Sequence, residues 1–452
     1  MTLLWAEQAL LEHGWAENVA LTLEGDRIAS ITEGAPPQGQ RLGILLPAPT
    51  NLHSHAFQRA MAGLTERRGP DPRDSFWTWR QLMYRFLDRL TPDDVQAIAA
   101  FVQMEMAQAG YAAVAEFHYL HHGPGGVPYA NPAEMAARIA AAAEITGLGL
   151  TLLPVLYEFG GCDGRALGPG QNRFGNTPDR FAALLDAAQN ALSPLPADTV
   201  LGVAPHSLRA VSVAGLAFAA ALRPKAPLHM HLAEQKAEVE EVLAHRGARP
   251  TEWLLANADV DARWCLIHCT QMKPHETTAL AATGAVAGLC PITESSLGDG
   301  IFEGVSYAAQ GGRWGIGSDS NIRIALSEEL RTLDYSQRLR DQSRAALASA
   351  SKSTGRVLLE TAAQGGAQAA GRDAGAIAVG KLADLVALES TGPDMAGHRG
   401  DTTVDAYIFA GDDRMVKELW SAGRHLVSGG RHRAQEAITA AYLATVTKLR
   451  AL

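Results

Sequence analysis

Short apolar, β-rich runs alternate with alanine-rich segments over most of this 452-residue chain. Such alternation is typical of a parallel sheet whose strands are joined by crossover helices. The runs that we expect to form strands lie at residues 50–55, 112–117, 149–156, 199–204, 227–232, 264–268, 284–289 and 313–318. Eight such units predict a closed (β/α)₈ TIM-like barrel of the α/β class, to which we assign residues 48–375.

Three expected helix starts share one local pattern. Thr91-Pro92, Asn131-Pro132 and Thr177-Pro178 each place a capping side chain before a proline, with an acidic residue close behind. A polar side chain before the first helical residue caps free N–H groups, and proline is well tolerated in the first turn. We therefore predict helices that begin at these three prolines.

Strand-like segments also occur at both chain ends. Residues 19–23 and 28–31 flank a hairpin-like turn, and similar runs lie at 383–388, 404–409 and 425–427. The amino-terminal segment is too short to fold alone. We therefore predict that residues 1–47 and 376–452 join into one small β-sandwich domain beside the barrel.

Composition excludes several classes of function. The formal net charge is -9, and no lysine precedes Lys225, so a nucleic-acid or membrane partner is not expected. The four cysteines form no Cys-x-x-Cys pair, which favours a reducing compartment. The amino terminus shows no secretion signal and no apolar span, and we expect a cytoplasmic location. A small-molecule partner fits these observations best.

A His-x-His pair follows the first expected strand of the barrel. In an extended segment alternate side chains share one face, so His53 and His55 point to the same side. Further polar residues follow later strands, namely His231, His268 and Asp319. The carboxyl ends of barrel strands meet on one face. A catalytic zinc site has about three protein ligands and an open position, so this set predicts a metal centre.

This set, with Glu234 three residues after His231, resembles the amidohydrolase superfamily of metal-dependent hydrolases over nearly the whole chain. The resemblance implies one bound metal ion, most often zinc. The ligands that it implies are His53, His55, His231 and Asp319.

The resemblance also implies the catalytic groups. His268 and Asp319 would orient and deprotonate a water molecule, and Glu234 would shuttle its proton. General chemistry gives the same roles, because an ionised water is a strong nucleophile and a carboxylic acid can protonate a departing amine. The structural alternatives are an exposed helix-start carboxylate for Glu234 and a core histidine for His268.

The lysine content bears on the number of metal ions. Binuclear members of the superfamily bridge two metals with a carboxylated lysine from a middle strand. Between His55 and His231 the only lysine is Lys225, at the wrong end of its strand. We therefore expect one zinc ion per chain, with another divalent metal as an alternative.

A second group of polar residues at the strand ends suits a substrate better than a metal. Its members are Gln58, Arg80, Tyr119, His206 and Arg209. Guanidinium groups pair with carboxylates in a bidentate manner, and imidazole or phenol adds one directed hydrogen bond. This group predicts a small dicarboxylate substrate.

The surrounding sequence resembles one branch of the superfamily, the formimidoylglutamate deiminases of histidine degradation. The matching stretches are Asn-Leu-His-Ser-His-Ala-Phe-Gln at 51–58, Trp-Thr-Trp-Arg at 77–80, Ala-Glu-Phe-His-Tyr-Leu-His at 115–121 and Pro-His-Ser-Leu-Arg-Ala-Val at 205–211. The resemblance implies hydrolysis of N-formimidoyl-L-glutamate to N-formyl-L-glutamate and ammonia. It also implies that the five polar residues hold the glutamate part.

Two other interpretations share the same metal ligands. A deaminase or hydrolase of a heteroaromatic substrate, of the guanine or chlorotriazine type, would need an apolar slot in place of two carboxylate clamps. A catalytically inactive scaffold would be expected to lack ligands, and none is missing from the sequence. A homodimer is an assembly that the sequence leaves open.

Overall fold

The computed structural model describes residues 1–66, 83–84 and 86–451. Its barrel strands are β5 (Thr50–Ser54), β6 (Ala113–His118), β7 (Gly149–Leu156), β8 (Val200–Leu201), β9 (Ala204–Pro205), β10 (Leu228–Leu232), β11 (Trp264–His268), β12 (Val286–Leu289) and β13 (Arg313–Ile316). The predicted strand positions are confirmed. The fourth run is divided into β8 and β9, which both pair with β7.

Parallel pairing and three short bridges close these strands into a ring. β5 to β8 form one parallel sheet and β10 to β13 form another. Bridges from Val203 to Leu228 and from Ser207 to His231 join the sheets on one side, and a bridge from Ser54 to Asp319 joins them on the other. The predicted barrel of the α/β class is confirmed.

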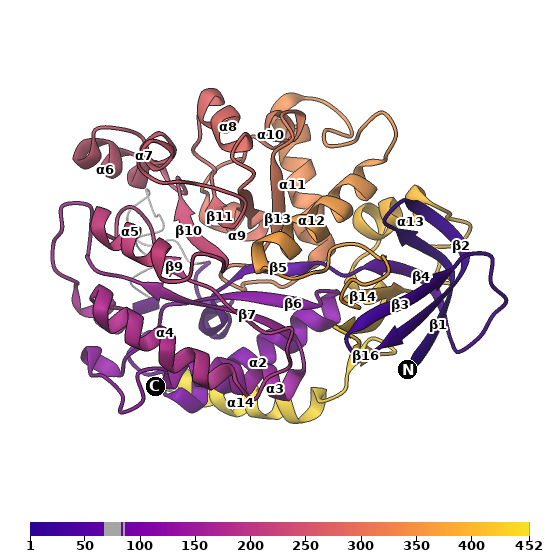
Figure 1. Cartoon of the computed structure of the whole chain (residues 1–452), viewed down its shortest axis with the longest axis horizontal. Coiled ribbons are helices and arrows are strands. Elements are labelled where there is room, and N and C mark those ends of the chain that lie inside the picture. The colour runs from indigo at the N-terminus through magenta and orange to yellow at the C-terminus, as the bar shows by residue number, and fades with distance from the viewer. Residues whose placement is uncertain (67–82, 85, 452) are drawn as a thin grey trace.

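Helices cover the outside of this ring (Figure 1). They are α2 (Pro92–Ala109), α3 (Glu134–Thr146), α4 (Pro178–Leu192), α5 (Val213–Leu222), α6 (Lys236–Arg246), α7 (Pro250–Asn257), α8 (Pro274–Ala281), α9 (Pro291–Leu297), α10 (Gly304–Ala309), α11 (Leu326–Asp341) and α12 (Thr354–Ala370). Within the described part of the chain, none of the helices has the length and apolar character needed to cross a membrane.

Two of the three predicted helix starts are confirmed. The Thr91 and Thr177 side chains accept N–H groups of the first turns of α2 and α4. The prediction at Asn131 is wrong by two residues, because α3 begins at Glu134. The Asn131 side chain accepts the Ala133 N–H at 3.0 Å and so caps a turn that precedes the helix.

The two chain ends together build a separate terminal sheet beside the barrel. Its strands are β1 (Thr2–Leu11), β2 (Gly14–Glu24), β3 (Arg27–Thr32), β4 (Gln40–Pro47), β14 (Leu385–Leu388), β15 (Val416–Ser421), β16 (Arg424–Ser428) and β17 (Arg431–His432). The spatial order is β17-β16-β15-β14-β4-β1-β2-β3, so the two ends meet where β4 pairs with β14. The β-sandwich predicted for the chain ends takes the form of one eight-stranded mixed sheet, at one end of the barrel (Figure 1).

Residues 404–409 do not form the strand that the sequence suggested. They lie in α13 (Asp401–Asp405) and η4 (Ala406–Ala410), a helical segment with Val404, Tyr407 and Ile408 buried. A short apolar run does not distinguish a buried strand from a buried helical turn, so tertiary packing decides. The last helix, α14 (Gln435–Arg450), packs on α2 of the barrel, where the Tyr442 and Phe101 rings stack at 3.8 Å.

A buried arginine links the barrel to the terminal sheet. Arg372 follows α12 and is fully buried. Its guanidinium donates to the Asp198 carboxylate at 2.9 Å and to the Asp384 carboxylate at 3.0 Å. Asp198 precedes β8, and Asp384 precedes β14. The arginine therefore pairs with one carboxylate from each part of the molecule, and Arg424 gives Asp198 a second cationic partner.

We predict that Arg372→Met lowers the free energy of unfolding by about 3 to 5 kcal/mol, the usual effect of removing one partner from a buried ion pair. The substitution leaves Asp384 buried without its cation. Urea unfolding of both proteins measures the loss.

Arg431→Met provides the control, because Arg431 and its partner Glu436 are 66% and 91% exposed. This variant is expected to unfold at the wild-type urea concentration. Equal stability of Arg372→Met and wild type would contradict the role of this linkage.

Candidate active site

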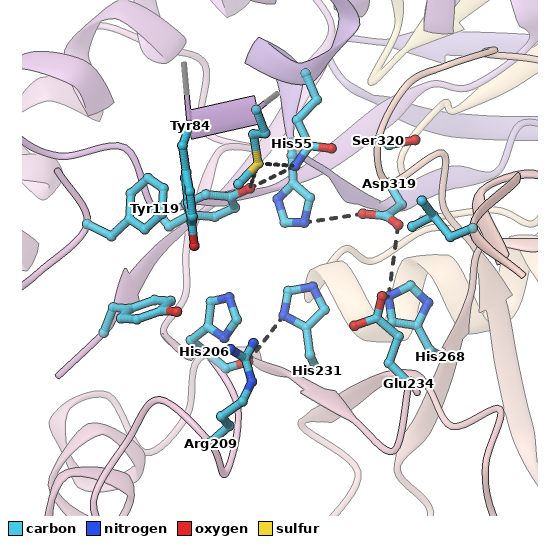
Figure 2. Close-up of a pocket in the computed structure, with 15 residues that line it drawn as sticks. His55, Tyr84, Tyr119, His206, Arg209, His231, Glu234, His268, Asp319 and Ser320 are labelled. Atoms are coloured by element: carbon cyan, nitrogen blue, oxygen red, sulfur yellow. Dashed lines mark hydrogen bonds and ion pairs between the residues drawn. The ribbon is translucent and has the colours of Figure 1, made fainter. Parts of the chain in front are cut away.

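Strained backbone turns end three strands at the same face of the barrel. Ala233 follows β10, His268 ends β11 and Asp319 follows β13, with φ angles of 51°, 73° and 46°. Positive φ is uncommon for residues with a Cβ atom and costs free energy that the surrounding structure must supply. The turns direct His268 and Asp319 toward one point and place Glu234 beside them (Figure 2).

Imidazole nitrogens and one carboxylate converge at that point. His53 Nε2 lies 3.1 Å from His231 Nε2 and 3.5 Å from Asp319 Oδ1. His55 Nε2 lies 3.2 Å from the same Asp319 oxygen. All four side chains are buried. The predicted ligands therefore lie together, although they come from opposite ends of the barrel sequence.

The Nδ1 atoms of two histidines donate hydrogen bonds to backbone carbonyls. The Nε2 atom of each ring therefore faces the cluster with a free lone pair. His55 Nδ1 donates to the Phe117 carbonyl at 3.0 Å, and His231 Nδ1 donates to the His206 carbonyl at 3.2 Å. Burial lowers the pKa of His53 to about 3 and the pKa of His231 well below its usual value. Neutral rings protonated at Nδ1 keep Nε2 lone pairs for a metal. The donor set fits a divalent cation.

One compact cluster of four donor residues differs in one member from the set expected by resemblance. Atoms of His53, His231, His268 and Asp319 all lie within 4.8 Å of one another. His55 contacts this cluster through Asp319. The two sets share three residues, and the ligand assignment stays a prediction.

Glu234 lies beside the cluster and forms an acid–base pair with His268. His268 Nε2 lies 3.8 Å from Glu234 Oε1 and 3.9 Å from Asp319 Oδ2, and its Nδ1 lies 3.2 Å from Glu294 Oε1. Burial lowers the pKa of His268, but the nearby carboxylates outweigh burial and raise it well above its usual value. Burial raises the pKa of Glu234. The pair can therefore hold a proton close to the candidate metal ligands.

The opposite side of the pocket carries phenol, amide and guanidinium groups. Gln58 Nε2 donates to the Tyr119 hydroxyl at 2.7 Å, and both residues line the pocket with His206 and Arg209. Arg209 Nη1 is buried and has no hydrogen-bond partner among the described residues. The same pocket is lined by His55, His231, Glu234, His268 and Asp319, so these groups and the candidate metal ligands face one space. Arg80, which was also predicted to bind substrate, lies outside the described residues.

Two family models together match nearly the entire chain. The model described as "Amidohydrolase family" matches residues 44–426, and the one described as "Formimidoylglutamate deiminase HutF, N-terminal domain" matches residues 1–41. The chain belongs to the amidohydrolase family. Formimidoylglutamate deiminase from Pseudomonas aeruginosa is 48% identical over 99% of this chain and 100% of its own length. The predicted resemblance is confirmed.

Solved structures of amidohydrolase relatives agree with this membership. An amidohydrolase from Brucella melitensis is 47% identical, covers 99% of this chain and 100% of its own, and has a TM-score of 0.95. An adenosine deaminase from Xanthomonas campestris with bound zinc is 20% identical, covers 100% of this chain and 99% of its own, and has a TM-score of 0.83. The second comparison shows a common fold.

Sequence reasoning did not identify Tyr157, which lines this amidohydrolase pocket, or Glu294, which contacts His268 from behind the lining residues. Tyr157 directly follows β7 and lines the cavity, so the strand-end rule would have found it. Glu294 lies in the first turn of α9, where its carboxylate accepts the Cys290 N–H at 2.9 Å and contacts His268. An acidic residue in a first turn is common as a cap, so its sequence position gave no sign of the second contact.

We predict that His231→Ala abolishes stoichiometric metal binding, because it removes the nitrogen that lies 3.1 Å from His53 Nε2 and within 4.8 Å of the Asp319 carboxylate. Elemental analysis of the dialysed protein measures the metal content. His275→Ala is the matched control, since His275 is 61% exposed and pairs with Glu252. A full metal equivalent in His231→Ala would contradict the assignment of this cluster.

Proposed function

We propose that this amidohydrolase hydrolyses N-formimidoyl-L-glutamate to N-formyl-L-glutamate and ammonia. The observation that carries the proposal is the 48% identity to a formimidoylglutamate deiminase over the full length of both chains. The pocket supports it, because an acid–base pair lies at one side and a guanidinium at the other (Figure 2). Such a pocket suits a substrate with a hydrolysable C–N bond at one end and carboxylates at the other.

Zinc, one ion per chain, is the proposed cofactor, with His53, His55, His231 and Asp319 as the residues that would hold it. Another divalent metal would suit the same ligands. A divalent cation at this place would act as a Lewis acid and lower the pKa of water toward neutrality. Lys225 is exposed in the segment that precedes β10, away from the cluster at the other end of that strand, which supports a mononuclear site.

Under this proposal the side chains hold the water and move its protons. Asp319 and His268 would orient the water, and its first proton would pass by way of Asp319 to Glu234 while the oxygen forms a bond to the formimidoyl carbon. Glu234 would deliver this proton to the terminal nitrogen. The bond between this nitrogen and the carbon would then break, and the second proton of the water would pass to Asp319. The nitrogen leaves as ammonia, and the water oxygen becomes the formyl oxygen.

The glutamate part would lie at the opposite side. Arg209, with its buried Nη1 still able to donate, is the proposed partner of one carboxylate. His206, Tyr119 and Gln58 line the same cavity and offer further donors. Arg80 is proposed as the second guanidinium on sequence grounds alone.

Ammonia release from N-formimidoyl-L-glutamate tests the proposal directly. We expect turnover of this substrate, and we expect Arg209→Ala to lower kcat/KM by about 10²-fold or more. The reason is that an unpaired charge in a partly dry pocket costs on the order of 2 to 5 kcal/mol, and about 1.36 kcal/mol is a factor of ten. Arg344→Ala, at an exposed position, is the control and should match wild type.

Formimidoylglycine and guanine serve as comparison substrates. Formimidoylglycine lacks one carboxylate and should be hydrolysed far less efficiently by the wild type. Release of ammonia from guanine, with none from N-formimidoyl-L-glutamate, would refute the proposal and favour the heteroaromatic alternative.

We predict that Glu234→Gln lowers kcat by at least about 10²-fold, the lower end of the usual contribution of general acid–base catalysis. The amide cannot exchange the proton, but it has nearly the same shape as the carboxyl group. Metal content should therefore stay at the wild-type level, and elemental analysis checks this. Near-normal turnover would remove Glu234 from the proton pathway.

A further inference from the structure

The backbone of the Ala233–Glu234 turn is fixed from two directions. On one side, the Glu234 carbonyl accepts the Thr270 hydroxyl at 2.5 Å, and the Ala233 carbonyl accepts the Gln271 N–H at 2.9 Å. These bonds connect the turn to the segment after β11. The turn needs such support, because Ala233 has a left-handed φ of 51°.

On the other side, one carboxylate accepts both N–H groups of the turn. Glu238 Oε2 accepts the Glu234 N–H at 2.8 Å, and Glu238 Oε1 accepts the Ala233 N–H at 3.3 Å. Glu238 lies in the first turn of α6 and is partly buried, whereas Lys236 and Ala237 beside it are exposed. Hydrogen bonds to an ionised acceptor are stronger than neutral ones. This side chain therefore connects α6 to the turn that presents Glu234.

Glu238 also lies near the substrate side. It lines a small cavity together with Arg209, His206 and Glu241. Its negative charge therefore stabilises the guanidinium and opposes an approaching carboxylate. Neutralising Glu238 would remove this opposition, so it should not weaken the binding of an anionic substrate.

We propose that Glu238 is a positioning residue for Glu234. Its carboxylate holds the left-handed turn by both N–H groups and so keeps the Glu234 carboxyl beside His268. This inference rests on the proposed function for its kinetic consequence. Its structural consequence, hydrogen bonding of two particular amides, is independent of the substrate.

Glu238→Gln in the full-length, metal-loaded protein tests the proposal. Glutamine keeps one acceptor oxygen but turns an NH₂ group toward the other N–H of the turn. We expect kcat to fall by about 10-fold or more, the equivalent of one lost hydrogen bond to a charged group, with unchanged metal content and no rise in KM. Glu240→Gln, exposed on the same helix, should match wild type in all three quantities.

A double-mutant cycle separates positioning from general structural damage. If Glu238 acts through Glu234, Glu238→Gln should have no further effect on kcat in a Glu234→Gln background. If the two effects multiply in full, or if Glu238→Gln alone keeps the wild-type kcat, the proposal is wrong.

Amide hydrogen exchange provides a readout without substrate. We expect the Ala233 and Glu234 amides to exchange about 10-fold faster or more in Glu238→Gln than in Glu240→Gln, because each loses its charged acceptor. Unchanged exchange at both amides would overturn the proposal. If the wild type releases no ammonia from N-formimidoyl-L-glutamate, the proposed function fails, and the exchange measurement still decides the role of Glu238.

Discussion

Backbone hydrogen bonds between the first and last barrel strands bring the metal-site residues together. The Asp319 N–H donates to the His53 carbonyl, and the His55 N–H donates to the Asp319 carbonyl, both at 2.9 Å. These bonds require close approach of the two backbone segments, one at the end of β5 and one after β13. A Cβ atom on Gly317 would lie 2.7 Å from the His53 nitrogen, which is too short for any side chain. The candidate metal site therefore depends on closure of the barrel at a glycine.

Closure of the barrel does not by itself orient the side chains of the site. The turns at the ends of β10, β11 and β13 also determine their directions. A regular strand would send consecutive side chains alternately inward and outward. The left-handed residues Ala233, His268 and Asp319 break that alternation, so that Glu234 follows His231 into the same pocket. Hydrogen bonds from neighbouring loops and α6 hold these turns. The strained left-handed turns are therefore what orients the acid–base side chains toward the pocket.

The features that the sequence predicted are those that arise locally. His53 near the end of β5 and His55 just after it have ring centroids 4.6 Å apart, as strand alternation predicts, and all eight apolar runs contain strands. The helical segment at 404–409 was not predictable in this way, because burial against other helices decides its form. The contacts of Glu238 and Glu294 depend on turns that bring separate segments together. No spacing pattern in the sequence encodes them.

The two sides of the pocket carry groups of opposite charge, with carboxyl groups on one side and a guanidinium on the other. Around the candidate metal site, the Asp319 and Glu294 carboxyl groups are buried and Glu234 is partly buried, while burial keeps the His53 and His231 imidazoles neutral. Such a group of donors favours a cation strongly, because buried carboxylates are costly unless they are paired. Across the pocket, the Arg209 guanidinium favours an anion for the same reason. A substrate that is anionic only at its far end can therefore bind in one direction, with its reactive carbon toward the cation site.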